Sequence, residues 1–194
     1  MTDILSYSLI TVGDLKNFMG IDTPIYDEKL TMIVNAMTDY IESRTGRRFK
    51  STAYTEYVNG DGSDALQMKQ YPITAITSVE ENSNSDNSSN WATLATTEYF
   101  NIGNYLDAGI IKKTAGAFRG TANYRVTYTA GYTTLPSDLK YACYMLASEA
   151  FNRSRSAGVK SESLGDHSIT FESISMENDN VEKVIQRYRK YTIA

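Results

Sequence analysis

The spacing of the apolar residues changes twice along the chain, and this limits the fold more than any other feature. Up to residue 50, apolar residues recur every three or four positions, as Leu30 and Val34 do, which is the spacing of one helix face. Between 51 and 132 they alternate with polar residues, as in Tyr124 and Val126, which is typical of strands. The helical spacing then returns. This order predicts an α+β fold.

The predicted domain organisation follows these changes of spacing. Residues 1–50 form the N-terminal helices of a helical bundle, and residues 133–158 add a further core helix. A β-rich subdomain over 51–132 is inserted between them. Residues 159–194 form an extended C-terminal arm with a short strand and a terminal helix.

Capping residues mark the ends of the first two helices. Thr11 and Asp14 resemble a capping box, and Gly20 is placed to end the helix that they begin. The second helix begins at Asp27 and ends at Gly46, because glycine tolerates the left-handed conformation found after a helix.

The strand predictions rest on alternation and on turn residues. Asn59-Gly60-Asp61-Gly62 predicts a tight turn, and the polar stretch over 82–90 predicts an exposed loop. A short strand is also predicted near the C-terminus, over 168–171. The strands predicted in the insertion are 53–58, 65–68, 75–79, 99–102, 109–112 and 123–129.

Composition excludes several classes of site. The chain has one cysteine, Cys143, and one histidine, His167, so it forms no internal disulfide and no histidine-based or cysteine-rich metal cluster. The net charge of −4 gives no general attraction for nucleic acid. No apolar stretch reaches the roughly 20 residues that span a bilayer. We expect a cytoplasm-like, reducing compartment.

The enzyme hypotheses are weak. A Cys143–His167 pair with Asp166 beside it is conceivable, but Cys143 lies on the apolar face of a predicted helix, where a buried thiol is inert. Asp61 and Asp64 occupy predicted turns and are expected to cap backbone groups. We therefore predict no catalytic residue, no cofactor and no metal. The Cys143→Ala and His167→Ala variants are expected to keep their function.

Two basic clusters remain. Arg44, Arg47, Arg48 and Lys50 follow the second helix and are interpreted as complementing its negative end. The second cluster lies on the terminal helix, beside an apolar stripe that suits docking to another chain. The predicted portal or subunit interface comprises Val181, Val184, Ile185, Arg187, Tyr188 and Arg189. Possible contacts with a DNA channel or a partner are Lys183 and Lys190.

The terminal helix is expected to lie outside the monomer core, because it ends the chain. Deletion of residues 181–194 is therefore expected to leave a folded protein that no longer joins its partner.

The order of motifs resembles the longer members of the head–tail connector (adaptor) family of tailed phages, over about residues 9 to 191. Those motifs are Leu15-Lys16-Asn17-Phe18-Met19-Gly20-Ile21, Leu30 to Ile41, Ser43-Arg44-Thr45-Gly46-Arg47-Arg48-Phe49, Tyr71-Pro72-Ile73-Thr74-Ala75-Ile76, Val126-Thr127-Tyr128-Thr129-Ala130-Gly131-Tyr132, Leu135-Pro136-Ser137-Asp138-Leu139-Lys140, Lys160-Ser161-Glu162-Ser163-Leu164-Gly165-Asp166 and Tyr188-Arg189-Lys190.

The resemblance implies a structural protein of the virion, at the head–tail interface, that is made in the host cytoplasm. Its subunits are expected to form a twelve-fold ring below the portal protein and to contact the next neck or tail-completion protein. The ring extends the channel for double-stranded DNA, helps to retain the genome and offers a tail-docking surface. A head-closure or tail-completion protein is the first alternative, followed by a DNA-binding factor and, last, a hydrolase.

Overall fold

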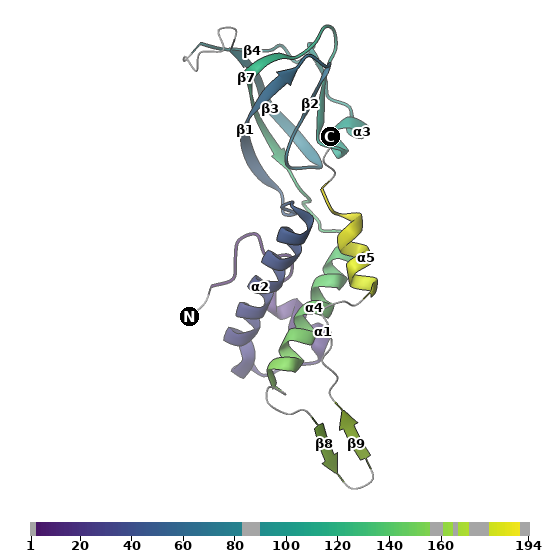
Figure 1. The fold of residues 1–194 in the computed structure, drawn as a ribbon. Coiled ribbons are helices and arrows are strands. Elements are labelled where there is room, and N and C mark those ends of the chain that lie inside the picture. The colour runs from purple at the N-terminus through teal and green to yellow at the C-terminus, as the bar shows by residue number, and fades with distance from the viewer. Residues whose placement is uncertain (1–2, 83–89, 156–160, 165–166, 171–178, 191–194) are drawn as a thin grey trace. The chain divides into compact units, whose positions relative to one another are not determined.

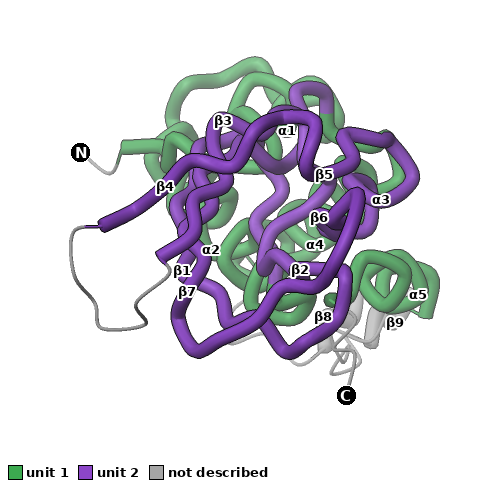
Figure 2. Tube along the Cα trace, turned by 90° about the horizontal axis from the view of Figure 1, so that it is seen from above, with its two compact units in different colours: residues 1–46, 135–194 green, residues 47–134 purple. Residues whose placement is uncertain are grey.

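The chain forms two compact units. A computed structural model describes residues 3–82, 90–155, 161–164, 167–170 and 179–190. The helical unit comprises Met1–Gly46 and Leu135–Ala194, and the β unit comprises Arg47–Thr134, as the two colours of Figure 2 show. The β-rich insertion expected over 51–132 lies inside the β unit. The predicted α+β fold is confirmed.

The helical unit is built around two long antiparallel helices, which Figure 1 shows side by side. Their facing apolar stripes form its core, and a shorter N-terminal helix packs against both of them. The helices are α1 (Val12–Met19), the 3-10 turn η1 (Pro24–Tyr26), α2 (Asp27–Thr45), α4 (Ser137–Arg155) and α5 (Asp179–Arg187). Fully buried core residues include Leu15, Leu30, Val34, Ile41, Leu139, Cys143, Ala147 and Phe151.

The predicted helix ends are confirmed. The Thr11 side chain accepts a hydrogen bond of 3.0 Å from the backbone N–H of Asp14, as an N-cap should. Gly20 and Gly46 follow α1 and α2 with φ of 68° in both cases. That left-handed conformation is strained for residues with a Cβ atom, so both glycines end their helices.

The β unit consists of two antiparallel sheets around one core, with the short helix α3 (Gly103–Asp107) at its side. The four-stranded sheet has the order β1 (Thr52–Asp61), β7 (Arg119–Ala130), β3 (Ile73–Asn82) and β4 (Trp91–Thr93). The three-stranded sheet has the order β2 (Ala65–Gln67), β6 (Ile110–Lys113) and β5 (Tyr99–Phe100).

Strand β7 is the centre of the four-stranded sheet and pairs with both β1 and β3. Tyr124, Val126 and Tyr128 are fully buried, while Arg125 and Thr127 between them lie on the other face. This confirms the predicted alternation. A strand with one buried face fixes its own register, because a slip by one residue would expose all three apolar side chains.

The two ends of the β unit are joined to each other. The backbone N–H of Tyr132 donates to the carbonyl of Phe49 at 2.7 Å, and that of Ser51 donates to the carbonyl of Tyr132 at 3.2 Å. A Cβ atom on Gly131 would lie 2.7 Å from the Lys50 carbonyl oxygen, so this close approach requires glycine. The chain therefore enters and leaves the β unit at the same place.

The structure differs from the predictions at several places. Strand β1 runs through the expected turn to Asp61, because Gly60 pairs with Gly120 of β7 after a register shift. Helix α3 follows β5, but its five residues are too few to give a detectable period. The C-terminal arm contains a hairpin, β8 (Ser161–Leu164) and β9 (His167–Thr170), instead of one strand. The loop predicted over 82–90 falls mainly on residues 83–89, outside the described residues.

Candidate interaction surfaces

The terminal helix α5 belongs to the core of the helical unit. Val181 and Ile185 retain only 5% and 2% of their exposure and pack with the unit that α2 and α4 form. The expectation that this helix lies outside the monomer core is therefore wrong. An amphipathic stripe must be covered by something, and here the chain covers it itself.

Polar contacts hold both ends of α5. Near its C-terminal end, Asp138 of α4 accepts a hydrogen bond of 2.8 Å from the Arg187 guanidinium and one of 2.7 Å from the Tyr188 hydroxyl. At the other end Arg44 of α2 donates to Glu182 at 2.8 Å. Hydrogen bonds from Gln186 and then from Arg44 lower the pKa of the Glu182 carboxyl. These contacts orient the helix, whereas the buried apolar side chains supply most of its stability.

The predicted interface residues thus divide into three groups. Val181 and Ile185 are buried, and Val184 is half-buried. Arg187 and Tyr188 are bound to Asp138 within the unit, although the Arg187 side chain is still 68% exposed. Lys183 and Arg189 are exposed, whereas Lys190 is half-buried. The predicted residues that remain exposed are therefore basic.

Arg47 is not a surface cation at the end of α2. It is 5% exposed within the β unit, and its guanidinium carbon lies 3.6 Å from the centre of the Tyr71 ring and 5.4 Å from that of Phe49. It also donates a hydrogen bond to the Tyr71 carbonyl. The interpretation of this residue as a helix-end charge is wrong, because stacking on aromatic rings suits a buried guanidinium.

A cross-strand row on the outer face of the four-stranded sheet was not predicted. Tyr57, Arg125 and Glu80 are direct neighbours on β1, β7 and β3. Arg125 donates two hydrogen bonds to Glu80, of 2.6 and 2.9 Å, and lies 4.8 Å from the centre of the Trp91 ring. The bond from Arg125 lowers the pKa of the Glu80 carboxyl. Alternation places these side chains outward, but only the strand register brings them together.

Cys143 is a buried structural residue. It is fully buried on α4, and burial raises the pKa of its thiol to about 12. A thiol that stays protonated at neutral pH is a poor nucleophile, so the predicted inert role is confirmed. The side chain of His167, its hypothetical partner, lies outside the described residues.

Cys143 is expected to resist alkylation in the folded protein. Treatment with iodoacetamide at about pH 8 should leave it unmodified, because little thiolate forms and the helix core excludes the reagent. Mass spectrometry before and after unfolding in guanidinium chloride measures this, with complete modification expected only after unfolding. Rapid alkylation of the native protein would contradict the buried position.

Neither a metal centre nor a membrane helix is present in the described part of the chain. Within these residues, no three His, Cys, Asp or Glu side chains gather as a metal ion requires. No helix there is long and apolar enough to cross a bilayer.

The fold is shared with proteins of particle necks. The structure matches a chain from the neck of a native gene transfer agent particle computed with C12 symmetry, with a TM-score of 0.65 and 15% identity. It matches a chain from the empty particle's neck computed with C6 symmetry, with a TM-score of 0.64 and 16% identity. A third match is a chain from the virion of the native gene transfer agent particle, with a TM-score of 0.64 and 17% identity. Each match covers 100% of this chain and 95% of the other.

At the level of sequence, no curated protein matches the chain. The family model described as "Head completion protein" matches residues 8–191, which is nearly the whole chain. This match confirms the predicted relationship to proteins that join phage heads and tails. The chain belongs to the head completion protein family, which is a family of structural virion proteins and not of enzymes.

Proposed function

We propose that the chain is the subunit of a ring that lies below the portal protein and joins the head to the tail. The observation that carries this proposal is the match of the complete fold, over both units, to neck chains from particles computed with C12 and C6 symmetry. A cyclic ring of identical subunits repeats one heterologous contact until it closes. We infer a dodecamer in the virion.

The partners follow from this position. One end of the ring binds the portal and the other binds the next neck or tail-completion protein, while double-stranded DNA passes through the centre. The net charge of −4 suits a channel through which DNA must slide, because many phosphate contacts would hold the DNA in place. In this role the ring extends the channel, helps to retain the genome and offers the tail a docking surface.

A head-closure or tail-completion protein, one layer further from the portal, is the second candidate. The description of the family as head completion favours it equally. The two candidates differ in their direct partner. A connector binds the portal by itself, whereas a head-closure protein binds only after a connector is in place.

Removing this protein from infected cells is expected to give DNA-filled heads without tails, or heads that lose their DNA. Electron microscopy of the lysate counts tailed and tailless particles, and expression of the wild-type chain in trans is the control. Adding the purified chain to isolated portal should then give a ring in averaged images. Normal tailed particles without the protein would contradict the proposed function. Binding only in the presence of another neck protein would favour the second candidate.

A further inference from the structure

An acidic stripe runs along the outer side of α2. Its members recur at helical spacing and all are exposed: Glu28, Met32, Ala36, Asp39 and Ser43. Met32 is 56% exposed, although it is a large apolar residue. The stripe thus places an apolar centre, Met32 and Ala36, between two carboxylates, Glu28 and Asp39. We call it the α2 face.

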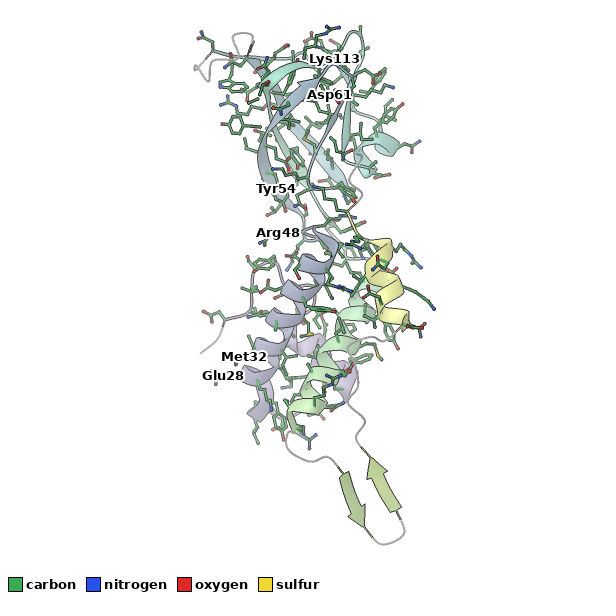
Figure 3. All side chains as sticks on the ribbon, viewed as in Figure 1. Glu28, Met32, Arg48, Tyr54, Asp61 and Lys113 are labelled. Carbon is green, nitrogen blue, oxygen red and sulfur yellow. The ribbon has the colours of Figure 1, made fainter. Side chains whose placement is uncertain are left out.

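The buried residues of α2 show that the α2 face points away from the core of the helical unit. Leu30, Val34 and Ile41 point to the core of the helical unit, and a helix turns by about 100° per residue. Met32 is therefore opposite to them. Figure 3 agrees, since Glu28 and Met32 lie on the side of α2 that points away from α4.

Exposed basic side chains lie on α5 from Lys183 onward and just beyond its end. Lys183, Gln186 and Arg187 of α5 and Arg189, two residues past the helix, are exposed, and we call them the α5 face. Helix α5 packs against α4 and also against α2, whereas Glu28 and Met32 lie on the side of α2 that points away from α4 (Figure 3). The α2 face and the α5 face are thus two different surfaces of one helical unit.

We propose that the α2 face of one copy binds the α5 face of the next copy, and that this contact builds the ring. The inference rests on the proposed function, which it deepens by naming the surfaces between subunits. Two different faces of a unit make a head-to-tail contact, the kind that a closed ring requires. Opposite charge makes the contact favourable and makes pairing of two like faces unfavourable.

The apolar centre of the α2 face also suits contact with the α5 face of a second copy. Met32 adapts its shape to a neighbour more easily than a branched side chain does, and Ala36 lets another helix come close. On the α5 face, the aliphatic part of Lys183 and the half-buried Val184 can cover Met32. Apolar contact then adds to the charge pairing, which salt weakens.

A charge exchange tests the contact. The first variant, Lys183→Glu with Arg189→Glu, makes the α5 face acidic but keeps Arg187 with its partner Asp138. The second, Glu28→Lys with Asp39→Lys, makes the α2 face basic. Each variant alone is expected to assemble on isolated portal at least about tenfold more weakly than the wild type, because like charges now meet. An equimolar mixture should restore the ring, since the two subunits can alternate.

The control changes two lysines of the β unit in the same way, Lys50→Glu with Lys69→Glu, and should assemble like the wild type. Circular dichroism confirms that every variant is folded, and averaged electron micrographs count the rings. A chain with all four α2 and α5 changes should also assemble. Rings from each variant alone, or no rescue in the mixture, would overturn the proposed contact and leave the neck function standing. Failure of the wild type to form a ring would instead overturn the proposed function.

Discussion

Deletion of residues 179–194 is expected to unfold the helical unit and to leave the β unit folded. The deletion removes Val181 and Ile185 from the core of the helical unit. Truncation of one buried isoleucine to alanine costs about 2–5 kcal/mol, and whole domains have roughly 5–15 kcal/mol of stability. Loss of the complete helix is therefore expected to remove most of the free energy that keeps the helical unit folded. The β unit has its own core, to which α5 contributes no residue.

Two spectroscopic signals separate these effects. The circular dichroism of the helices should fall sharply, whereas the fluorescence of Trp91, the only tryptophan of the chain, reports the β unit and should stay native. Ile185→Ala is the milder variant, and Lys183→Ala on the exposed side of α5 is its matched control. A deletion variant with full helical signal and unchanged thermal unfolding would show that α5 is not part of the core.

Tyr128→Ala is expected to destabilise the β unit by about 3–5 kcal/mol, by analogy with large-to-small changes of buried aromatic residues. Tyr128 is fully buried on the central strand. Its hydroxyl donates to Glu56 and accepts a hydrogen bond of 3.3 Å from the backbone N–H of Gln70. The loss of the ring leaves a cavity, and the loss of the hydroxyl leaves these polar groups without their partner. Both effects weaken the unit.

Urea unfolding followed by Trp91 fluorescence measures this change. Ile102→Ala in the same unit is the control, because Ile102 is 46% exposed and its truncation should change the free energy of unfolding by only about 0.5 kcal/mol.

Burial, more than the hydrogen bond to Glu56, raises the pKa of Tyr128. The stabilisation that the protonated Tyr128 gives to the folded state is therefore complete below about pH 10 and is lost progressively as the pH rises above that value. Tyr128→Phe should lose less stability at high pH than the wild type. A Tyr128→Ala variant as stable as the control would contradict the buried network.

Local signals in the sequence were enough for much of the fold. Helix α2 was predicted with both its ends, because Asp27 and Gly46 act within one turn of the chain. The strand around Tyr124 and Val126 was predicted because alternation is a local property with a strong energetic basis. The inert state of Cys143 followed from its place on an apolar helix face.

Partners distant in the sequence were not predictable in this way. The apolar stripe of α5 looks the same whether another chain or its own chain covers it, so Val181 and Ile185 were assigned to the wrong partner. Arg47 follows a helix end, and nothing nearby in the sequence indicates that the Tyr71 ring stacks on it. The row of Tyr57, Arg125 and Glu80 depends on the register of three strands. Sequence spacing within each strand does not determine that register.

The junction between Phe49 and Tyr132 has a consequence for how the chain folds. Helices α2 and α4 pack together although the complete β unit separates them in the sequence. Closing so long a flexible loop costs entropy, and that cost grows with the number of free residues. Once the β unit has formed, its joined ends reduce the effective loop to a few residues. We therefore infer a folding order in which the inserted unit forms first and holds the two chain ends together. The helices on either side then pack with little further loss of chain entropy.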